Sequence, residues 1–302
     1  MKWLEVSLIV DGELAEAVAD VLSRHVPNGV ALQIEDAGDR VNASTRVKVL
    51  AYLNVDDGTE ARREKIEQGL WHLGQIQPIP KPSYRVIEEQ NWNKIWKASY
   101  KPIPIGESLL VLPAWYEAPK GKRQAIILDP GMAFGTGLHP TTQLCLTAME
   151  DYLETGASVI DLGCGSGILS IAAIRLGAGT VWALDTDPTA IENARTNIKR
   201  NGMPERIRLE EGSLPKILNN ESGQDSADLL LANIYSTILV DLLDAGLTRA
   251  VRPQGRLILS GIMRHQSEAI RAKCMALGAQ LLETRRDGDW VALVLRKLPE
   301  LP

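Results

Sequence analysis

The fold is decided by residues Val159–Ile168, which read VIDLGCGSGI. A mostly apolar run typical of a buried strand leads into three glycines at alternate positions, Gly163, Gly165 and Gly167, and the pattern then becomes helical. Glycines in such a turn allow positive φ and let a ligand approach the backbone closely. A plain turn would not require three residues that each cost conformational entropy. The stretch therefore predicts a binding site for a nucleotide-like ligand.

The spacing of these glycines favours one nucleotide class. In the dinucleotide fingerprint GxGxxG, counted from Gly163, the third glycine would be residue 168, which is Ile168 here. This disfavours a nicotinamide oxidoreductase, and the spacing GxGxG resembles that of class I methyltransferases that bind S-adenosylmethionine. The next strand ends at Asp185, whose carboxylate is expected to accept both ribose hydroxyls, a feature that both classes share. Asp187 precedes Pro188, so we expect it to cap a helix.

From about residue 140, strands alternate with helices, a pattern that predicts a parallel sheet with helices on both faces. A final pair of strands is joined by a turn at Asp287–Gly288, which predicts an antiparallel hairpin at the sheet edge. The expected fold class is α/β with a seven-stranded, mostly parallel, Rossmann-like sheet. The seven predicted strands are Ser158–Leu162, Thr180–Leu184, Arg206–Leu209, Asp228–Ala232, Gly255–Ser260, Gln280–Thr284 and Trp290–Arg296, and the predicted helices include Leu169–Leu176, Thr189–Asn201, Ile238–Val251 and Gln266–Leu277.

The first third of the chain predicts a small α+β domain in the order β-α-β-β-α-β, the ferredoxin-like split unit. Its predicted elements are Trp3–Val10, Glu13–His25, Val30–Ile34, Arg46–Val55, Glu60–Leu73 and Tyr84–Ile87. We expect residues 1–88 to form this domain and residues 89–105 to form a linker with a short helix that carries Trp92 and Trp96. Residues 106–302 are expected to form the catalytic domain, opened by two strands at Ser108–Trp115 and Gln124–Leu128.

Charge is unevenly distributed between these parts. The chain has 302 residues and a formal net charge of −5; residues 1–90 hold 10 Lys and Arg against 15 Asp and Glu, whereas residues 91–302 hold 23 of each. The acidic excess of the first part is either a solvated face or a docking surface for a basic partner. Both interpretations argue against a first domain that binds nucleic acid, which would need a basic surface.

Composition excludes several classes of protein. The three cysteines, Cys145, Cys164 and Cys274, form no CxxC pair, and the four histidines form no HExxH, so neither a zinc hydrolase nor any metal site is expected. No apolar run approaches the ~20 residues that span a bilayer, and the start of the chain lacks the features of a signal peptide. We expect a cytoplasmic protein with no membrane partner.

A candidate catalytic residue follows the fourth strand of the sheet. Asn233 stands at the carboxyl end of that strand, in the sequence LANIYS, where methyltransferases acting on nitrogen often carry an Asn-Pro-Pro-Tyr tetrad. Its side-chain oxygen, with a neighbouring backbone carbonyl, would accept from a target N–H and aim the lone pair at the methyl group. A helix cap is the alternative. Its place in the crevice of the sheet favours the catalytic role.

The stretch DPGMAFGTGLHPTT, residues 129–142, is nearly identical to the DPGxAFGTGxHxTT signature of the ribosomal protein L11 methyltransferase (PrmA) family. The resemblance continues in NWNKIWKASYKPI before it and in DLGCGSGILSIAAIRLGA, DTDPTAIENARTN and ANI after it, and it covers essentially the whole chain. It departs from the family at Tyr235 and Ser236, where members vary, which affects the expected contact to the acceptor amine.

The resemblance implies an S-adenosylmethionine-dependent enzyme that trimethylates lysines and the N-terminal amine of protein L11, free or on the ribosome. It implies a class I methyltransferase domain behind a substrate-recognition domain, without a metal, without direct nucleic-acid binding, and acting as a monomer. Carried over to this sequence, the cofactor-binding positions are Thr142, Gly163, Asp185 and Asn233, with Phe134 and Gly135 lining the site and Gly165 in the glycine turn.

Other functions stay open at this level. A methyltransferase of the same class acting on RNA or on another protein would share the catalytic half. A binding module that holds S-adenosylmethionine without catalysis would share the glycine turn, although Asn233 speaks against it.

Overall fold

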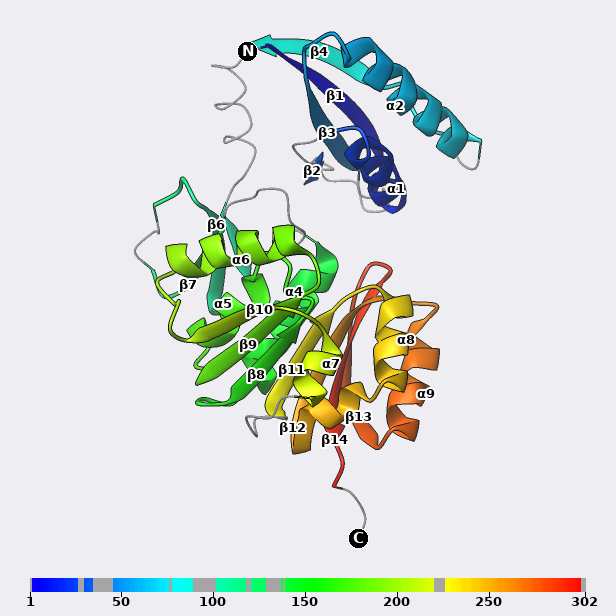
Figure 1. Cartoon of the computed structure of the whole chain (residues 1–302). Helices are drawn as coiled ribbons and strands as arrows, with labels where there is room; N and C mark the ends of the chain where they lie inside the picture. Colours follow the sequence, from blue (N-terminus) through cyan, green and yellow to red (C-terminus); the bar gives the residue numbers. More distant parts are fainter. Residues whose placement is uncertain are drawn as a thin grey trace. The chain divides into compact units, whose positions relative to one another are not determined.

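The computed structural model (Figure 1) describes residues 2–26, 30–34, 46–75, 78–88, 102–117, 121–128, 137, 139–219 and 226–299, and the structural statements below concern these residues. The chain forms two compact units, Met1–Lys101 and Pro102–Pro302. The predicted linker helix around Trp92 and Trp96 lies outside the described residues.

The first unit is an antiparallel sheet with two helices. Its strands lie in the order β2-β3-β1-β4, and alternate residues of β1 and β3 share one core with the apolar faces of α1 and α2. This confirms the predicted ferredoxin-like topology. The elements are β1 (Lys2–Asp11), α1 (Gly12–Ser23), β2 (Val30–Ile34), β3 (Arg46–Asn54), α2 (Thr59–Gly74) and β4 (Ser83–Glu88).

The second unit contains the predicted seven-stranded sheet, in the order β10-β9-β8-β11-β12-β14-β13. The five strands from β10 to β12 are parallel, and the hairpin β13–β14 joins antiparallel at one edge, with β14 paired to β12. The predicted fold class is confirmed. The strands are β8 (Ser158–Leu162), β9 (Thr180–Asp185), β10 (Ile207–Glu211), β11 (Ala227–Asn233), β12 (Val251–Met263), β13 (Ala279–Asp287) and β14 (Trp290–Lys297).

Helices cover both faces of this sheet, and side-chain alternation decides which residues they meet. In β11, Leu229 and Leu231 pack with the layer of α4, α5 and α6, whereas Leu230 and Ala232 pack with the layer of α7, α8 and α9. In Figure 1, α8 and α9 lie side by side. The helices are α4 (Pro140–Tyr152), α5 (Ile168–Arg175), α6 (Pro188–Arg200), α7 (Leu214–Leu218), α8 (Ser236–Asp244) and α9 (Ser267–Ala276).

A separate three-stranded sheet opens the second unit. It consists of β5 (Ile103–Ile105), β6 (Leu109–Pro113) and β7 (Gln124–Leu128), with β6 central, antiparallel to β5 and parallel to β7. Sequence periodicity indicated β6 and β7 but not the three-residue β5. Ile105 and Leu109 are almost fully buried in the core that α4 and α5 share, so this sheet helps to hold both helices.

One sequence prediction in this unit was wrong in detail, and one short helix was missed. The helix predicted over Ile238–Val251 ends early, since α8 stops at Asp244 and Gly246 adopts a left-handed φ of 97°, which terminates a helix. A 3-10 turn over Leu247–Ala250 follows, and Val251 already begins β12. The short helix α7 was not predicted, because its five residues show too little periodicity.

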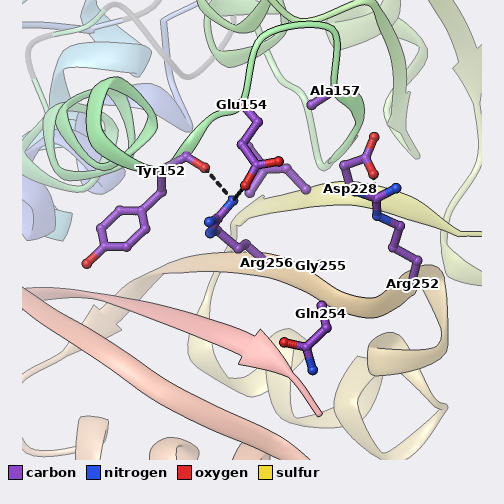
Figure 2. Close-up of a pocket in the computed structure, with 9 residues that line it drawn as sticks. Tyr152, Glu154, Ala157, Asp228, Arg252, Gln254, Gly255 and Arg256 are labelled. Atoms are coloured by element: carbon purple, nitrogen blue, oxygen red, sulfur yellow. Dashed lines mark hydrogen bonds and ion pairs between the residues drawn. The ribbon is translucent and has the colours of Figure 1, made fainter. Parts of the chain in front are cut away.

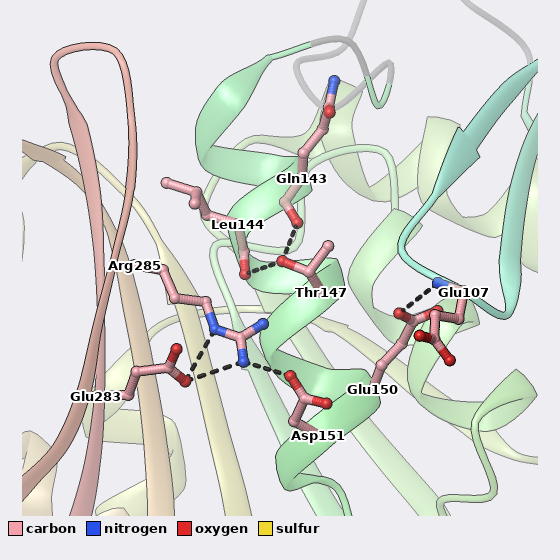
Figure 3. Close-up of polar contacts among 8 residues, drawn as sticks. All are labelled: Glu107, Gln143, Leu144, Thr147, Glu150, Asp151, Glu283 and Arg285. Atoms are coloured by element: carbon pink, nitrogen blue, oxygen red, sulfur yellow. Dashed lines mark hydrogen bonds and ion pairs between the residues drawn. The ribbon is translucent and has the colours of Figure 1, made fainter.

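Helix α4 is fixed near its carboxyl end by polar contacts (Figure 3). The Glu150 carboxylate accepts hydrogen bonds from the backbone N–H of Glu107 at 3.0 Å, the backbone N–H of Ser108 at 2.8 Å and the Ser108 hydroxyl at 2.6 Å. Burial raises the pKa of the Glu150 carboxyl, but these hydrogen bonds lower it by more, so its pKa lies below the usual value. Arg285 of β13 pairs with both Asp151 and Glu283. The first turn of α4 is therefore presented on a rigid support.

A substitution at Gly261 tests how closely β12 packs against the segment after β11. A Cβ there would collide with the backbone carbonyl of Ile234, and Gly261 has a φ of 79°. Gly278 shares that φ but has no heavy atom within 4 Å of the added Cβ, so it is the matched control. We expect Gly278→Ala to lower the free energy of unfolding by about 1–2 kcal/mol through backbone strain. Gly261→Ala should cost roughly 1–3 kcal/mol more through overpacking. Equal losses in urea unfolding would contradict this packing.

Candidate functional site

The glycine turn follows β8 at the carboxyl edge of the sheet. Gly163, Gly165 and Gly167 all have positive φ, at 73°, 54° and 78°, as the sequence predicted. The backbone N–H groups of Gly163 and Cys164 both donate to the carbonyl of Leu184, at 2.8 and 2.9 Å. A Cβ added at Gly163 would lie 2.5 Å from Cγ2 of Ile234, so the turn after β8 closely approaches the segment after β11. These contacts hold the turn against both neighbouring strands.

The third glycine serves helix packing. A Cβ at Gly167 would lie 3.3 Å from the Cβ of Ala194, and the side-chain amide of Asn197 donates to the carbonyl of Ser166 at 3.0 Å. Helix α6 thus supports the base of the turn, and α5 begins at Ile168 directly behind it. Gly163 and Gly167 thus both pack closely against neighbouring segments, Gly163 against Ile234 and Gly167 against Ala194.

Asp185 ends β9 beside this turn. Its Oδ2 accepts from the N–H of Gly165 at 2.8 Å, and its Oδ1 accepts from the N–H of Asp187 at 3.0 Å. Within the described residues each oxygen accepts one hydrogen bond, and a carboxylate oxygen can accept two. The arrangement leaves one acceptor position on each oxygen, which fits the two hydroxyls of a ribose. The residues present therefore fit the nucleoside part of S-adenosylmethionine.

Asp187 caps α6, as predicted. Its Oδ1 accepts from the N–H of Thr189 at 2.8 Å, and Pro188 occupies the first turn of the helix. Of the two carboxylates, Asp187 is thus used by the helix and Asp185 by the turn.

Thr142 and Asn233 meet at the same edge of the sheet, on the next strand after β8, although 91 positions separate them. The side-chain amide of Asn233 donates to Oγ1 of Thr142 at 3.3 Å. Thr142 is fully buried in the first turn of α4, whereas Asn233 is only partly buried. Among the described residues nothing donates to the Asn233 Oδ1, which is the atom expected to accept from an acceptor amine. The structure thus gathers the predicted residues into two bonded pairs, Gly165 with Asp185 and Thr142 with Asn233.

Phe134 and Gly135 lie outside the described residues, so their predicted place in the site is not addressed. One residue of the site escaped the sequence analysis. Asp161 is fully buried in β8, two positions before the glycine turn, where its Oδ2 accepts from the Ser170 hydroxyl at 2.6 Å. Its Oδ1 is buried without a hydrogen-bond partner in the described part of the chain. A carboxyl group inside an otherwise apolar strand was the available indication.

The opposite edge of the sheet carries a small hollow that is not a candidate site (Figure 2). It lies where β8 and β11 begin, between Glu154, Asp228, Arg252 and Arg256. The charges there neutralise one another. Arg256 pairs with Glu154 at 2.7 Å and donates to the carbonyl of Tyr152 at 3.2 Å, and Arg252 pairs with Asp228. In parallel sheets ligands bind at the carboxyl ends of the strands, which is where the predicted residues gather.

Other chemistries find less support in the described residues. The three cysteines are free and buried, and burial raises the pKa of the Cys145 thiol to about 12 and that of Cys274 to about 11, so neither is a ready nucleophile. Within the described ranges no three His, Cys, Asp or Glu side chains gather as a metal site would require. Nor does any helix of that part have the length and apolar character to cross a bilayer.

Known proteins of one family are similar to this chain over nearly its whole length. Residues 2–298 match the family model described as ribosomal protein L11 methyltransferase (PrmA). A protein of Chloroflexus aurantiacus named ribosomal protein L11 methyltransferase is 39% identical, with 98% of each chain covered. A protein of the same name from Herpetosiphon aurantiacus is 36% identical, with 98% of this chain and 99% of that protein covered.

One solved structure is similar in both fold and sequence. It is the crystal structure of a ribosomal protein L11 methylase from Lactobacillus delbrueckii subsp. bulgaricus, with a TM-score of 0.59 and 34% identity. The similarity covers 66% of this chain and 100% of that one.

The buried carboxyl of Asp161 predicts a dependence of stability on pH. Burial raises its pKa to about 6 in the folded protein, above the value near 4 of an exposed carboxyl. The folded state therefore binds the proton more tightly, and ionising Asp161 removes stability as the pH rises from about 4 through 6. Asp161→Asn lacks this loss. The melting temperature of the variant minus that of the wild type should therefore increase between about pH 4 and pH 6 and stay constant above about pH 7.

Asp187→Asn is the matched control, since Asp187 is an exposed carboxyl at the same sheet edge and asparagine caps helices equally well. A difference between Asp161→Asn and the wild type that does not change with pH would contradict the raised pKa.

Proposed function

The chain belongs to the ribosomal protein L11 methyltransferase family, and on that premise we propose that it transfers methyl groups from S-adenosylmethionine to lysine side chains and the N-terminal amine of protein L11, up to the trimethylated state. The observation that carries the proposal is the pairing at one sheet edge. We assign Gly165 and Asp185, at the ends of β8 and β9, to the nucleoside, and Thr142 with Asn233, at the end of the next strand β11, to the acceptor.

The donor half of the site binds through the chain's own backbone and one carboxylate. We propose that Asp185 accepts the two ribose hydroxyls, that Gly163 and Gly165 allow close approach, and that Thr142, Phe134 and Gly135 also contact the donor. S-adenosylmethionine supplies an activated methyl on a sulfonium. Its leaving group therefore needs no acid and no metal, and a chelator should leave the rate unchanged.

The acceptor half must present a neutral amine. A lysine with a pKa near 10.4 is almost fully protonated at pH 7, and uncovering its lone pair costs about 4–5 kcal/mol. Removal from water in the crevice lowers that cost. We propose that the Asn233 Oδ1 accepts an N–H of the neutral amine in the first two transfers to a lysine and so directs its lone pair at the methyl carbon. The neutral dimethylated amine has no N–H, so the third transfer proceeds without this hydrogen bond. Before each transfer the ammonium loses its proton to water; the N–C bond then forms as the S–C bond breaks, and the sulfur keeps the electron pair.

The first unit is proposed to recognise the substrate protein. Helix α2 carries exposed Glu60, Glu64, Glu67 and Trp71 at a spacing that places them on one face. Arg63 pairs with Glu60 and Glu67, so the face keeps a net acidic charge. Trp71 is 61% exposed, which is unusual for so large an apolar side chain. An acidic face with an aromatic anchor suits a basic protein partner, because charge steers the encounter and a tryptophan supplies contact energy.

The remaining features of the proposal follow from this substrate. A ribosomal protein is met in the cytoplasm, whether free or on the ribosome, and comparing the two as substrates decides which form is used. A monomer suffices, because every group invoked comes from one chain. The acidic first unit gives no basic surface for direct binding of nucleic acid.

Methyl transfer to purified L11, measured with labelled S-adenosylmethionine and mass spectrometry, tests the proposal, with ribosomal RNA as the alternative acceptor. Asn233→Ala should lower kcat by roughly 10- to 100-fold, the effect of one hydrogen bond to a nitrogen that becomes positively charged in the transition state, with a smaller loss of donor affinity. Asp185→Asn should instead weaken donor binding in calorimetry. An unchanged kcat with a raised KM for the donor in Asn233→Ala would refute the aiming role, and label in RNA alone would refute the substrate.

The α2 face is tested by charge reversal and truncation. Glu64→Lys should raise the KM for L11 by up to about fivefold at low salt, and Trp71→Ala by about tenfold, with kcat unchanged. Glu268→Lys is the control, an exposed glutamate on α9 paired with an arginine three residues on. The effect of Glu64→Lys should shrink as salt is added. If both α2 variants keep the wild-type KM, this helix does not recognise the substrate.

A further inference from the structure

An aromatic contact adjoins the acceptor side of the site. His139 caps α4 and Thr142 lies one turn further on, so both stand on the same side of the helix, with about 5–6 Å between their Cβ atoms. The ring of His139 packs against Trp290 of β14, with the ring centroids 4.9 Å apart and the planes at 67°. Thr142 bonds Asn233. Trp290 and Asn233 are thus joined through two neighbouring positions of one helical turn.

Side-chain alternation places Trp290 and Asn233 on the same face of the sheet. Asn233 follows Leu229 and Leu231 at two-residue steps in β11, and Trp290 precedes Val294 by two such steps in β14. All three leucine and valine side chains belong to the core shared with α4. Only β12 separates the two strands, so the indole and the amide lie on the same face near the carboxyl edge of the sheet.

The register places Trp290 farther than Asn233 toward the carboxyl end of β12, where we expect a substrate side chain to enter. Asn233 pairs with Ser260 of β12, whereas Trp290 pairs with Met263, three residues closer to the carboxyl end of that strand. Trp290 is only partly buried, and Met263 is 36% exposed. An incoming side chain would pass these two residues before its end reaches Asn233.

The chemistry of this entrance suits the acceptor that the proposed function requires. Lysine combines an aliphatic stem with a terminal amine, and aromatic and thioether surfaces pack against aliphatic chains and attract ammonium ions. We infer that Trp290, held by His139, forms the wall of the acceptor site, where it packs against the stem of the substrate lysine and aims its amine at Asn233. This inference rests on the proposed function.

A wall that contacts the stem does not distinguish the methylation states, because each methyl is added at the far end. It therefore retains the mono- and dimethylated lysine between transfers. Trp290 is a positioning residue in this account, and its loss releases partly methylated intermediates.

The test compares Trp290→Ala and Trp290→Phe with the wild type. Trp290→Ala should weaken L11 binding, measured by calorimetry with S-adenosylhomocysteine present, by about tenfold, with a smaller loss for Trp290→Phe. The KM for L11 should rise more than kcat falls, and mass spectra at low turnover should shift from trimethylated toward monomethylated lysine. Affinity for S-adenosylhomocysteine should stay unchanged.

Trp182→Phe is the matched control. Trp182 lies in β9 of the same sheet, packs in the layer of α7 to α9, and its indole N–H donates to Glu210 at 3.3 Å. The control variant therefore replaces a tryptophan with phenylalanine at a position away from the acceptor side. If Trp290→Phe and Trp182→Phe give the same L11 affinity and product distribution as the wild type, the inference is overturned. A wild type that transfers no methyl to L11 would instead refute the proposed function. Should Trp290→Ala fail to fold, Trp290→Phe carries the test.

Discussion

One backbone carbonyl, that of Leu184, organises the site. It accepts from the N–H groups of both Gly163 and Cys164, and so fixes the turn after β8 against the end of β9. The same turn places the N–H of Gly165 on Asp185. Such a turn is open only to residues that tolerate positive φ, which is why glycine occupies the alternate positions. The orientation of the Asp185 carboxylate therefore depends on the turn, and so does its proposed bond to a ribose.

The carboxyl edge of the sheet is divided between two tasks. Strands β8 and β9 offer the glycine turn and Asp185, and strands β11 and β14 offer Asn233 and Trp290. Helix α4 supports the second of these pairs, since its N-cap His139 contacts Trp290 and its Thr142 bonds Asn233, while its last turn is tied to the β5–β6 turn through Glu150. In the proposed function the donor and acceptor groups are thus held by separate elements of one unit, as methyl transfer between two bound molecules requires.

The order of strands and helices was predictable because apolar periodicity is local, and the turns at Gly163 and Asp287 mark it clearly. Asp185 and Asp187 were told apart from the sequence, since a proline follows only the second. What the sequence could not supply were contacts between distant residues. Nothing in the sequence pairs Thr142 with Asn233 or His139 with Trp290, and the buried state of Asp161 depends on helix α5 packing over its strand. The prediction from periodicity also missed the early end of α8, because a single residue, Gly246 with its positive φ, terminates the helix.

The central claim is that the turn after β8 and the end of β9 hold the methyl donor while the end of β11 faces the acceptor. The most direct measurement is a crystal structure of the protein with S-adenosylhomocysteine. The account predicts both ribose hydroxyls within hydrogen-bond distance of Asp185 and the sulfur on the side of Asn233. A ribose turned away from Asp185, or the product bound in the hollow beside Arg256 at the opposite edge, would contradict it.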